Sequence, residues 1–367
     1  MRAVTAAVSI VATGILLSPA PARADIAVGT VGPMSGSFAI LGAQMMAGAE
    51  QAIADINAAG GLLGEHLVLE VADDKCDRAT AGSLANQMIG RGVALVVGHL
   101  CSGASTVASP IYHDAGIIQI SPGARAASYT DGRPGPGTFR ISGRNDDQGR
   151  IAGEFLATRF ANKRIAIVHD RSPYGIALAE ATLKAMNQAG KDEAFSEGYP
   201  ADERSLSPLF ARLSAETIDV LFFAGYHAEA ALIARRKHQE NIEATLVSGE
   251  ALMTEEFVDM AGAAADGTLI VYPPDPTRNE SARDVVRRLA AKGIFADGYV
   301  LYAYAAVQAW AAAIKAAGTV EFAPVAAALA DRQFETVLGV IDFDEKGDVN
   351  LPSYVVYEWR DGQYDYH

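Results

Sequence analysis

Short apolar runs alternate with longer segments of helical periodicity along most of this chain. In the first part, apolar side chains from Met45 to Ile56 recur at helical spacing until Gly60 ends the segment. The runs around this helix have the length and composition of buried strands. We expect these strands at 26–31, 66–72, 94–98 and 116–120. The alternation predicts a parallel βαβ series with right-handed crossovers.

A loop rich in proline and glycine at 131–137 interrupts this pattern, and a second βα series follows it. We expect its strands at 164–169, 194–199, 219–224, 244–248 and 268–272. The segment 281–330 is expected to be wholly helical, with two closing strands at 337–343 and 354–359. The prediction is therefore an α/β protein with two doubly wound parallel-sheet lobes. Ligands of such sheets bind at the carboxyl ends of the strands, so two facing lobes would share one cleft.

The first 24 residues have the features of a secretory signal peptide. A basic start at Arg2 precedes an apolar stretch to Leu17, and Ala22-Arg23-Ala24 is a small-x-small cleavage site. Residue 25 is Asp, so the sequence gives no sign of a lipid anchor there. No later segment is expected to be long and apolar enough to cross a bilayer. We expect a soluble exported protein of two domains, cleaved after Ala24.

The charge and the cysteines narrow the classes of partner and site. A formal net charge of −14 argues against nucleic acid and anionic membrane surfaces as partners. Two cysteines in an exported chain, Cys76 and Cys101, predict one disulfide. A metal pair or a catalytic thiol is the weaker alternative, because no Cys-x-x-Cys or helical His pair accompanies them.

The turn after the strand at 94–98 carries the first chemical signal. A strand that becomes a helix through Ser102-Gly-Ala-Ser-Thr106 directs free backbone N–H groups and hydroxyls to one spot. Such a helix start attracts anions, including carboxylates. Cys101 lies beside it, so we expect an anion pocket held in place by the disulfide.

Several motifs together resemble the periplasmic leucine/isoleucine/valine-binding proteins over nearly the whole chain after residue 24. They include Gly32-Pro-Met-Ser-Gly36, Gly48-Ala-Glu-Gln-Ala52, Cys76-Asp77, Gly98 to Ser102, Ile165 to Asp170, Gly225-Tyr-His227, Gly249-Glu250 and Phe343 to Asp348. The resemblance implies the type I periplasmic binding fold, with three hinge crossings. It implies lobe 1 at 25–141 and 273–348, and lobe 2 at 142–272 and 349–367. It also implies a monomeric receptor of an ATP-driven importer that delivers its ligand to a membrane permease, with no catalysis, metal or cofactor.

The resemblance also places ligand-binding residues. Ser102 matches the serine that binds the ligand's α-carboxylate, although an ordinary N-cap serine would look the same. Glu250 matches the acidic residue that binds the α-ammonium. Tyr174 and Tyr226 match cleft tyrosines of the second lobe, and core packing explains Tyr174 equally well. Tyr299 is a weaker candidate for the side-chain pocket, with helix packing as the simpler explanation.

Two departures from the family pattern lie in this region. Arg125, two residues after Gly123 of the turn 121–125, stands where the family has a carboxylate-binding threonine, and Leu41 replaces a tyrosine near the pocket mouth. Arginine binds carboxylates bidentately, so Arg125 is expected to take over that contact. A buried Glu250 needs a cation, which an amino acid brings as its ammonium. The expected ligand is therefore a small zwitterionic amino acid, with an amine-free aromatic or 2-oxo carboxylic acid second.

Two other function classes have weaker support. An exported hydrolase could use Ser102 and His99, but the sequence has no Gly-x-Ser-x-Gly elbow, His-Glu-x-x-His or phosphate-binding loop. His99, His169 and His227 lie beside strand ends, where structural histidines are common. A sensor ectodomain would need a membrane span or a signalling partner, and neither is encoded in this sequence.

Overall fold

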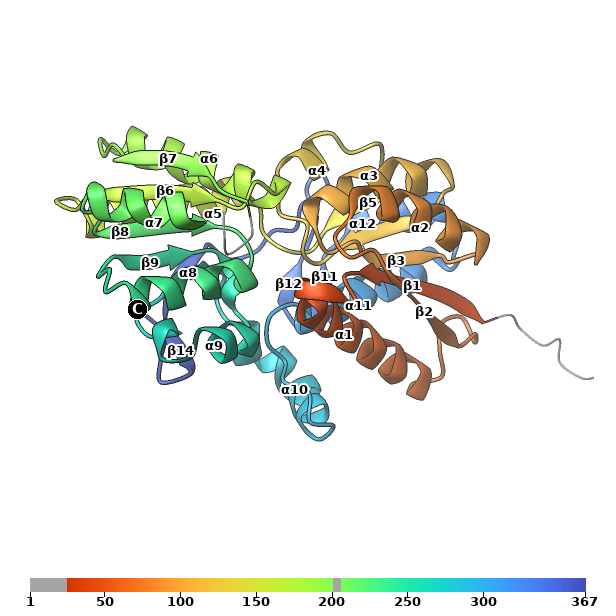
Figure 1. Cartoon of the computed structure of the whole chain (residues 1–367). Helices are drawn as coiled ribbons and strands as arrows, with labels where there is room; N and C mark the ends of the chain where they lie inside the picture. The colour runs from red at the N-terminus through yellow and green to blue at the C-terminus, as the bar shows by residue number, and fades with distance from the viewer. Residues whose placement is uncertain (1–24, 201–205) are drawn as a thin grey trace, which may run out of the picture.

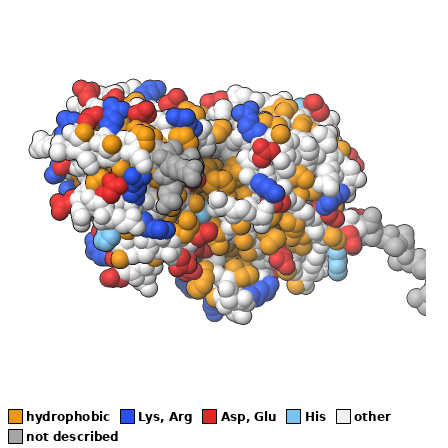
Figure 2. Space-filling view, viewed as in Figure 1, with side chains coloured by type: hydrophobic (Ala, Val, Ile, Leu, Met, Phe, Trp, Pro, Cys, Tyr) orange, Lys and Arg blue, Asp and Glu red, His pale blue; other side chains and the backbone are white. Residues whose placement is uncertain are grey.

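The computed structural model describes residues 25–200 and 206–367. Two lobes lie side by side, each with a β-sheet between layers of helices (Figure 1). The predicted signal peptide falls outside the described residues. Figure 2 shows acidic and basic side chains intermingled over both lobes.

The sheet of the first lobe has five parallel strands in the order β2-β1-β3-β4-β5. Buried apolar residues fill the central strands, as expected for a sheet covered on both faces. The strand bounds are β1 Ile26–Gly32, β2 Leu67–Asp73, β3 Leu95–Gly98, β4 Ile118–Ser121 and β5 Thr138–Arg140. Strand β5, which has only three residues, was not among the predicted strands.

Helices from both ends of the described chain cover this sheet. They are η1 Gly36–Phe38, α1 Ala39–Ala58, α2 Arg78–Gly90, α3 Ser102–Asp114, α4 Ser128–Asp131, α11 Val300–Ala317 and α12 Phe322–Asp331. Helix α1 packs along α11, and a Cβ on Gly48 would lie 2.0 Å from the carbonyl oxygen of Val300. The two helix backbones therefore approach closely at a position where only glycine fits.

Helix α11 corrects one expectation. By length and composition it could cross a membrane, although no later segment was expected to do so. Most of this helix is buried among the other elements of the first lobe, including Trp310 and Ile314. Its apolar composition follows from this position in the core, because a buried core helix and a membrane-spanning helix are both rich in apolar residues.

The sheet of the second lobe has seven strands in the order β14-β13-β10-β9-β8-β6-β7. The five strands from β6 to β10 are parallel, and β13 and β14 add antiparallel to the edge. The strand bounds are β6 Ile165–His169, β7 Phe195–Gly198, β8 Val220–Ala224, β9 Thr245–Ser248, β10 Leu269–Tyr272, β13 Val355–Arg360 and β14 Gln363–Tyr366. Its helices are α5 Asn145–Arg159, α6 Pro173–Gln188, α7 Leu206–Ala215, α8 His227–Gln239, η2 Glu250–Leu252, α9 Glu255–Ala261 and η3 Gly262–Ala265.

The segment between the two sheets differs from the prediction. The block 281–330 is not wholly helical, because residues 291–299 separate α10 from α11. The strand expected at 337–343 is instead part of a hairpin. These elements are η4 Pro276–Arg278, η5 Glu280–Ala282, α10 Arg283–Ala290, β11 Phe334–Thr336 and β12 Gly339–Ile341.

The chain passes between the two sheets three times. The first crossing is 141–144, the second begins after Tyr272, and the third is 349–354. The lobe boundaries expected from the sequence remain predictions. The predicted disulfide between Cys76 and Cys101 is confirmed, and it ties the connection between β2 and α2 to the start of α3.

Candidate ligand-binding site

The start of α3 is joined to the turn that follows β4. Cys101 is the N-cap of α3, and Ser102 is its first helical residue. The Ser102 hydroxyl accepts hydrogen bonds from the backbone N–H groups of Arg125 and Ala126, both at 3.1 Å. A Cβ on Gly123 would lie 2.8 Å from the carbonyl oxygen of Leu100, so this turn needs glycine there. The N-cap alternative for Ser102 is therefore wrong, because its oxygen holds the neighbouring turn.

The side chain of Arg125 is fully buried between the lobes. Its Nη1 donates to the hydroxyl of Tyr354 at 3.0 Å and to the carbonyl of Gly143 at 3.5 Å. Burial alone would lower the pKa of the guanidinium, but the carboxylate of Glu250 and the surrounding tyrosines raise that pKa well above its usual value. Arg125 is therefore a permanent cation in the interior.

Glu250 approaches Arg125 from the second lobe. It begins η2 directly after β9, and its Oε1 lies 2.7 Å from Nε of Arg125. Its Oε2 accepts hydrogen bonds from Gln148 Nε2 at 2.5 Å and from the Tyr174 hydroxyl at 3.1 Å. The carboxylate is thus held by its own lobe through one oxygen and meets the other lobe's cation through the second.

This contact is close, but it is not an aligned hydrogen bond. Nε and Nη2 of Arg125, and Oε1 of Glu250, are buried and make no hydrogen bond of good geometry among the described residues, although Nε and Oε1 are paired by charge and Tyr299 interacts with the guanidinium. A buried polar group costs about 1–3 kcal/mol when its hydrogen bond is not made, and the charge pairing of Nε with Oε1 offsets part of that cost here. The pair is therefore neutral in net charge, yet it retains donors and an acceptor that a further molecule could satisfy.

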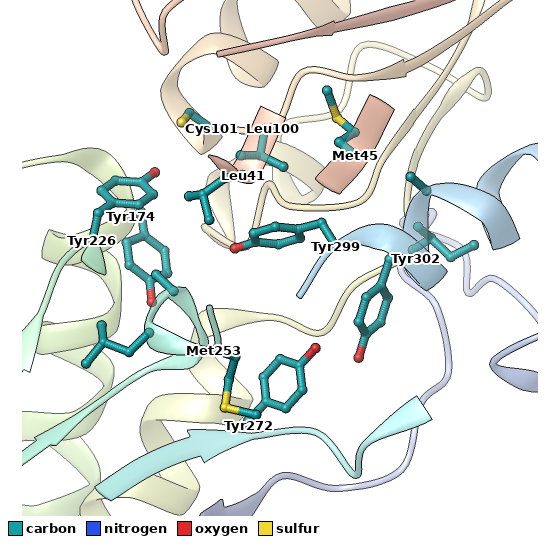
Figure 3. Close-up of a cluster of buried hydrophobic side chains, with 14 of the residues drawn as sticks. Leu41, Met45, Leu100, Cys101, Tyr174, Tyr226, Met253, Tyr272, Tyr299 and Tyr302 are labelled. Atoms are coloured by element: carbon teal, nitrogen blue, oxygen red, sulfur yellow. The ribbon is translucent and has the colours of Figure 1, made fainter. Parts of the chain in front are cut away.

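Apolar and aromatic side chains surround the two charges. In Figure 3, Leu41 from α1 and Tyr174 and Tyr226 from the second lobe point toward a common region, beside Tyr299. The rings of Tyr174 and Tyr226 are 5.1 Å apart. Burial and nearby acidic groups, Asp170 first among them, raise the pKa of Tyr226 well above its usual value, so this phenol stays protonated.

All eight ligand-binding residues expected from the sequence are buried, and they lie around the junction of the two lobes. Hereafter we call Ser102, Gly123, Arg125, Tyr174, Tyr226, Glu250, Leu41 and Tyr299 the interlobe site. Their binding roles remain predictions. One expectation differs from the geometry: Arg125 and Glu250 were each assigned to a group of the ligand, but here they contact each other.

Comparison with known proteins places this arrangement in a family. The profile of the family described as periplasmic binding protein matches residues 25–363. The chain belongs to the periplasmic binding protein family. It is 40% identical over 349 residues to Leu/Ile/Val-binding protein homolog 1 of Brucella melitensis, and the match covers 94% of each chain. The family expected from the sequence is confirmed, and with it the general character of an exported periplasmic receptor.

Solved structures show the same fold. One is the branched-chain amino acid transporter substrate-binding protein LivJ of Streptococcus pneumoniae in complex with isoleucine. Its TM-score is 0.83 and its identity 24%, covering 93% of this chain and 98% of that one. Another is a solute-binding protein of an ABC transporter from R. palustris in complex with benzoate. Its TM-score is 0.84 and its identity 21%, covering 94% of this chain and 95% of that one. These likenesses confirm the predicted type I fold.

Three residues of this periplasmic binding protein were missed by sequence reasoning. Gln148 contacts Glu250, Tyr354 contacts Arg125, and the ring of Phe38 lies 4.6 Å from that of Tyr226. A polar residue near the start of a helix, a tyrosine before a strand and a phenylalanine in a short 3-10 helix are common features. Only the folded arrangement distinguishes them.

The hydrolase alternative has no matching geometry in this binding protein. His99 is fully buried, with Nδ1 2.6 Å from Asp74 and Nε2 3.1 Å from the hydroxyl of Tyr112. Both ring nitrogens are therefore occupied, and the hydroxyl partner is a tyrosine rather than Ser102. Within 25–200 and 206–367, no group of three or more His, Cys, Asp or Glu side chains could hold a metal ion.

Proposed function

We propose that this protein is the receptor of an ATP-driven importer and binds a small zwitterionic amino acid, of branched-chain type or related, in the interlobe site. One observation carries the proposal. A buried cation from one lobe faces a buried anion from the other, and each has hydrogen-bonding atoms without partners. A molecule with a carboxylate and an ammonium supplies the complement of both.

The proposed binding mode follows from these unpaired atoms. The ligand carboxylate accepts from Arg125 and also from the Ser102 hydroxyl, which accepts two backbone N–H groups and can donate its own proton to the ligand. The ligand ammonium donates to Oε1 of Glu250. The ligand thus enters between the two charges and replaces their direct contact, while the net charge of the site stays at zero.

The relatives support this chemistry. The Brucella protein that is 40% identical is named for leucine, isoleucine and valine. The Streptococcus neighbour holds isoleucine, whereas the R. palustris neighbour holds benzoate, a carboxylate without an amine. An amine-free acid is accordingly our second candidate. It would satisfy Arg125 but leave a buried net charge of −1, because Arg125 already neutralises Glu250.

Calorimetric titration distinguishes the two ligand classes. We expect L-leucine to bind more tightly than 4-methyl-2-oxopentanoate, which has the same carbon skeleton but a keto oxygen in place of the ammonium, and more tightly than benzoate. Glu250→Gln should weaken L-leucine about tenfold or more, because a charge-assisted hydrogen bond contributes about 1.5–3 kcal/mol. The same substitution should affect the oxo acid much less. Tighter binding of the oxo acid or benzoate would favour the second candidate.

The remaining parts of the proposal concern the partners of the protein and the N-terminus of the mature chain. We propose that the receptor is a monomer that delivers its ligand to an inner-membrane permease, and that the mature chain begins at Asp25. The matched region of the family also starts at residue 25, which supports this position. Sequencing the N-terminus of the exported protein tests the start at Asp25, and its mass in solution tests the monomer.

A further inference from the structure

The two charges of the interlobe site are held by residues of the hinge. Gln148 lies one helical turn after the first crossing, and its side chain is fully buried. Its Nε2 donates to Oε2 of Glu250 at 2.5 Å and to the carbonyl of Val271 at 2.7 Å. Val271 is in β10, immediately before the second crossing. One amide thus connects the carboxylate to two hinge segments.

Gln148 also fixes the orientation of this carboxylate. Together with the Tyr174 hydroxyl it occupies Oε2, and Oε1 is left facing Arg125 without a hydrogen bond. If the carboxylate turned, Oε2 would lose both donors. Oε1 is therefore the oxygen that remains for a cation from outside the second lobe.

Tyr354 has the corresponding position beside Arg125. It is the last residue of the third crossing, and its hydroxyl accepts from Nη1 of Arg125 at 3.0 Å. The same hydroxyl donates to the carbonyl of Arg144, in the first crossing, at 3.1 Å. A Cβ on Gly143 would lie 2.2 Å from this hydroxyl, so glycine is needed for the two crossings to approach.

We propose that Gln148 and Tyr354 are positioning residues, through which the three hinge crossings set the geometry of Glu250 and Arg125 for the ligand. This inference rests on the proposed function for its ligand-binding part. As a consequence, opening the hinge changes the orientation of the Glu250 carboxylate and the Arg125 guanidinium as well as the distance between them. Neither residue needs to touch the ligand.

The test for Gln148 is a double-mutant cycle with Glu250. Gln148→Met retains the length and apolar stem of the side chain but removes the donor. We expect L-leucine to bind about ten- to a hundredfold more weakly by calorimetry. In the Glu250→Gln background, the same change should alter the affinity about twofold or less, since the charged acceptor is gone. An equal loss of affinity in both backgrounds would mean that Gln148 acts only through packing, and it would overturn the proposal.

Gln119→Met is the matched control. Gln119 is equally buried, and its Nε2 donates to the carbonyl of Gly98 within the first lobe. We expect this variant to lose stability comparably while L-leucine affinity stays within about twofold. Loss of affinity as large as in Gln148→Met would show a general effect of removing a buried amide, and would also overturn the proposal.

Tyr354→Phe is tested in a second double-mutant cycle, with Arg125→Thr as the partner substitution. Tyr129→Phe is the control. Tyr129 is buried and donates only to the carbonyl of Phe139. We expect Tyr354→Phe to weaken L-leucine about threefold to tenfold in the native background and not measurably with Arg125→Thr. A loss that persists without the guanidinium would remove Tyr354 from the proposal.

Urea unfolding without ligand separates this inference from the proposed function. If the native protein does not bind L-leucine, the proposed function fails for that ligand. The contacts are then tested by the coupling between Gln148→Met and Glu250→Gln in the free energy of unfolding. Non-additive effects support the positioning role, whereas additive effects overturn it.

Discussion

Glu229 is a buried acid that the interlobe site does not use. It lies in the first turn of α8, is 9% exposed, and its Oε2 has no hydrogen-bond partner in the described ranges. Burial, with a contribution from Asp170, raises its pKa from 4.5 to about 7. The folded state therefore holds the proton over a range of pH in which the unfolded chain has released it.

This shift predicts a loss of stability as the pH rises. Below pH 4.5 both states are protonated, so Glu229 has no effect there. Between 4.5 and about 7 the unfolded state binds fewer protons, and the free energy of unfolding falls by about 3 kcal/mol. Glu229→Gln should abolish this loss, giving higher stability than the native protein at pH 8 and equal stability at pH 4.

Urea unfolding at a series of pH values measures this effect. The exposed Glu335 offers a control, because Glu335→Gln removes the same charge from a solvated position. We expect Glu335→Gln to leave the pH dependence unchanged. A parallel pH dependence in Glu229→Gln and the native protein would assign the loss of stability to other groups.

At the residue scale, the sequence predicted which side chains gather at the interlobe site but not how they contact one another. Arg125 and Glu250 were placed there by resemblance, each with a ligand group as partner. Their direct contact depends on the relative position of two lobes, which no local pattern encodes. The same holds for Gln148 with Glu250, 102 residues apart, and for Arg125 with Tyr354, 229 residues apart.

At the element scale, glycines set the distance between α5 and α6. A Cβ on Gly153 would lie 2.5 Å from the carbonyl oxygen of Thr182 and 2.6 Å from the backbone N of Met186. Because these are backbone atoms, the two helices would have to separate to admit a methyl group. Helix α5 follows the first crossing and carries Gln148, so its packing against α6 also positions this residue of the site.

Gly153→Ala should therefore destabilise the protein by roughly 1–3 kcal/mol, although alanine is the better helix former. Gly82→Ala in α2 is the control, because its Cβ would meet only Val107 Cγ1 at 3.5 Å and Ile111 Cδ1 at 3.8 Å, which are ordinary contacts. This control should gain about 0.5–1 kcal/mol. Thermal unfolding of both variants measures the difference, and a gain in both would show that α5 can shift without cost.

Elements with clear periodicity were predicted well, and those defined by tertiary pairing were not. The helix expected from the spacing of Met45 to Ile56 is α1, which extends to Ala39 at its start. The interruption at 291–299 has no proline, but it contains Gly293 and Gly298, both at positive φ, and this signal for the end of a helix was not used. The hairpin of β11 and β12 pairs only with itself, so its register depends on a short turn rather than on an apolar run.

At the scale of the whole molecule, the two lobes meet through separate kinds of contact. Arg125 and Glu250 form the charged contact between them. The ring of Phe38, from the first lobe, packs on Tyr226 at 4.6 Å and lies 6.5 Å from His227 of the second. Such contacts exist only while the lobes are close together, so their energy favours closure rather than the folding of either lobe.

Phe38→Ala should therefore shift this protein toward an open arrangement. An aromatic pair contributes about 0.5–1.5 kcal/mol beyond the area it buries, which corresponds to a severalfold change in the balance between closed and open forms. The apparent affinity for a ligand falls by the fraction of closed molecules that is lost. We expect weaker L-leucine binding and a larger radius of gyration by small-angle X-ray scattering without ligand.

Phe322 provides the comparison that makes this result specific. Its ring is half-buried like that of Phe38, but its partner is His113 of the first lobe, with 6.1 Å between the two ring centroids. Phe322→Ala should lower the free energy of unfolding while the radius of gyration and the affinity for L-leucine stay unchanged. Phe38→Ala should increase the radius of gyration and weaken L-leucine binding, while the free energy of unfolding stays nearly unchanged. If both variants kept the native radius of gyration, the lobes would be held together by Arg125 and Glu250 with no measurable help from the aromatic contact.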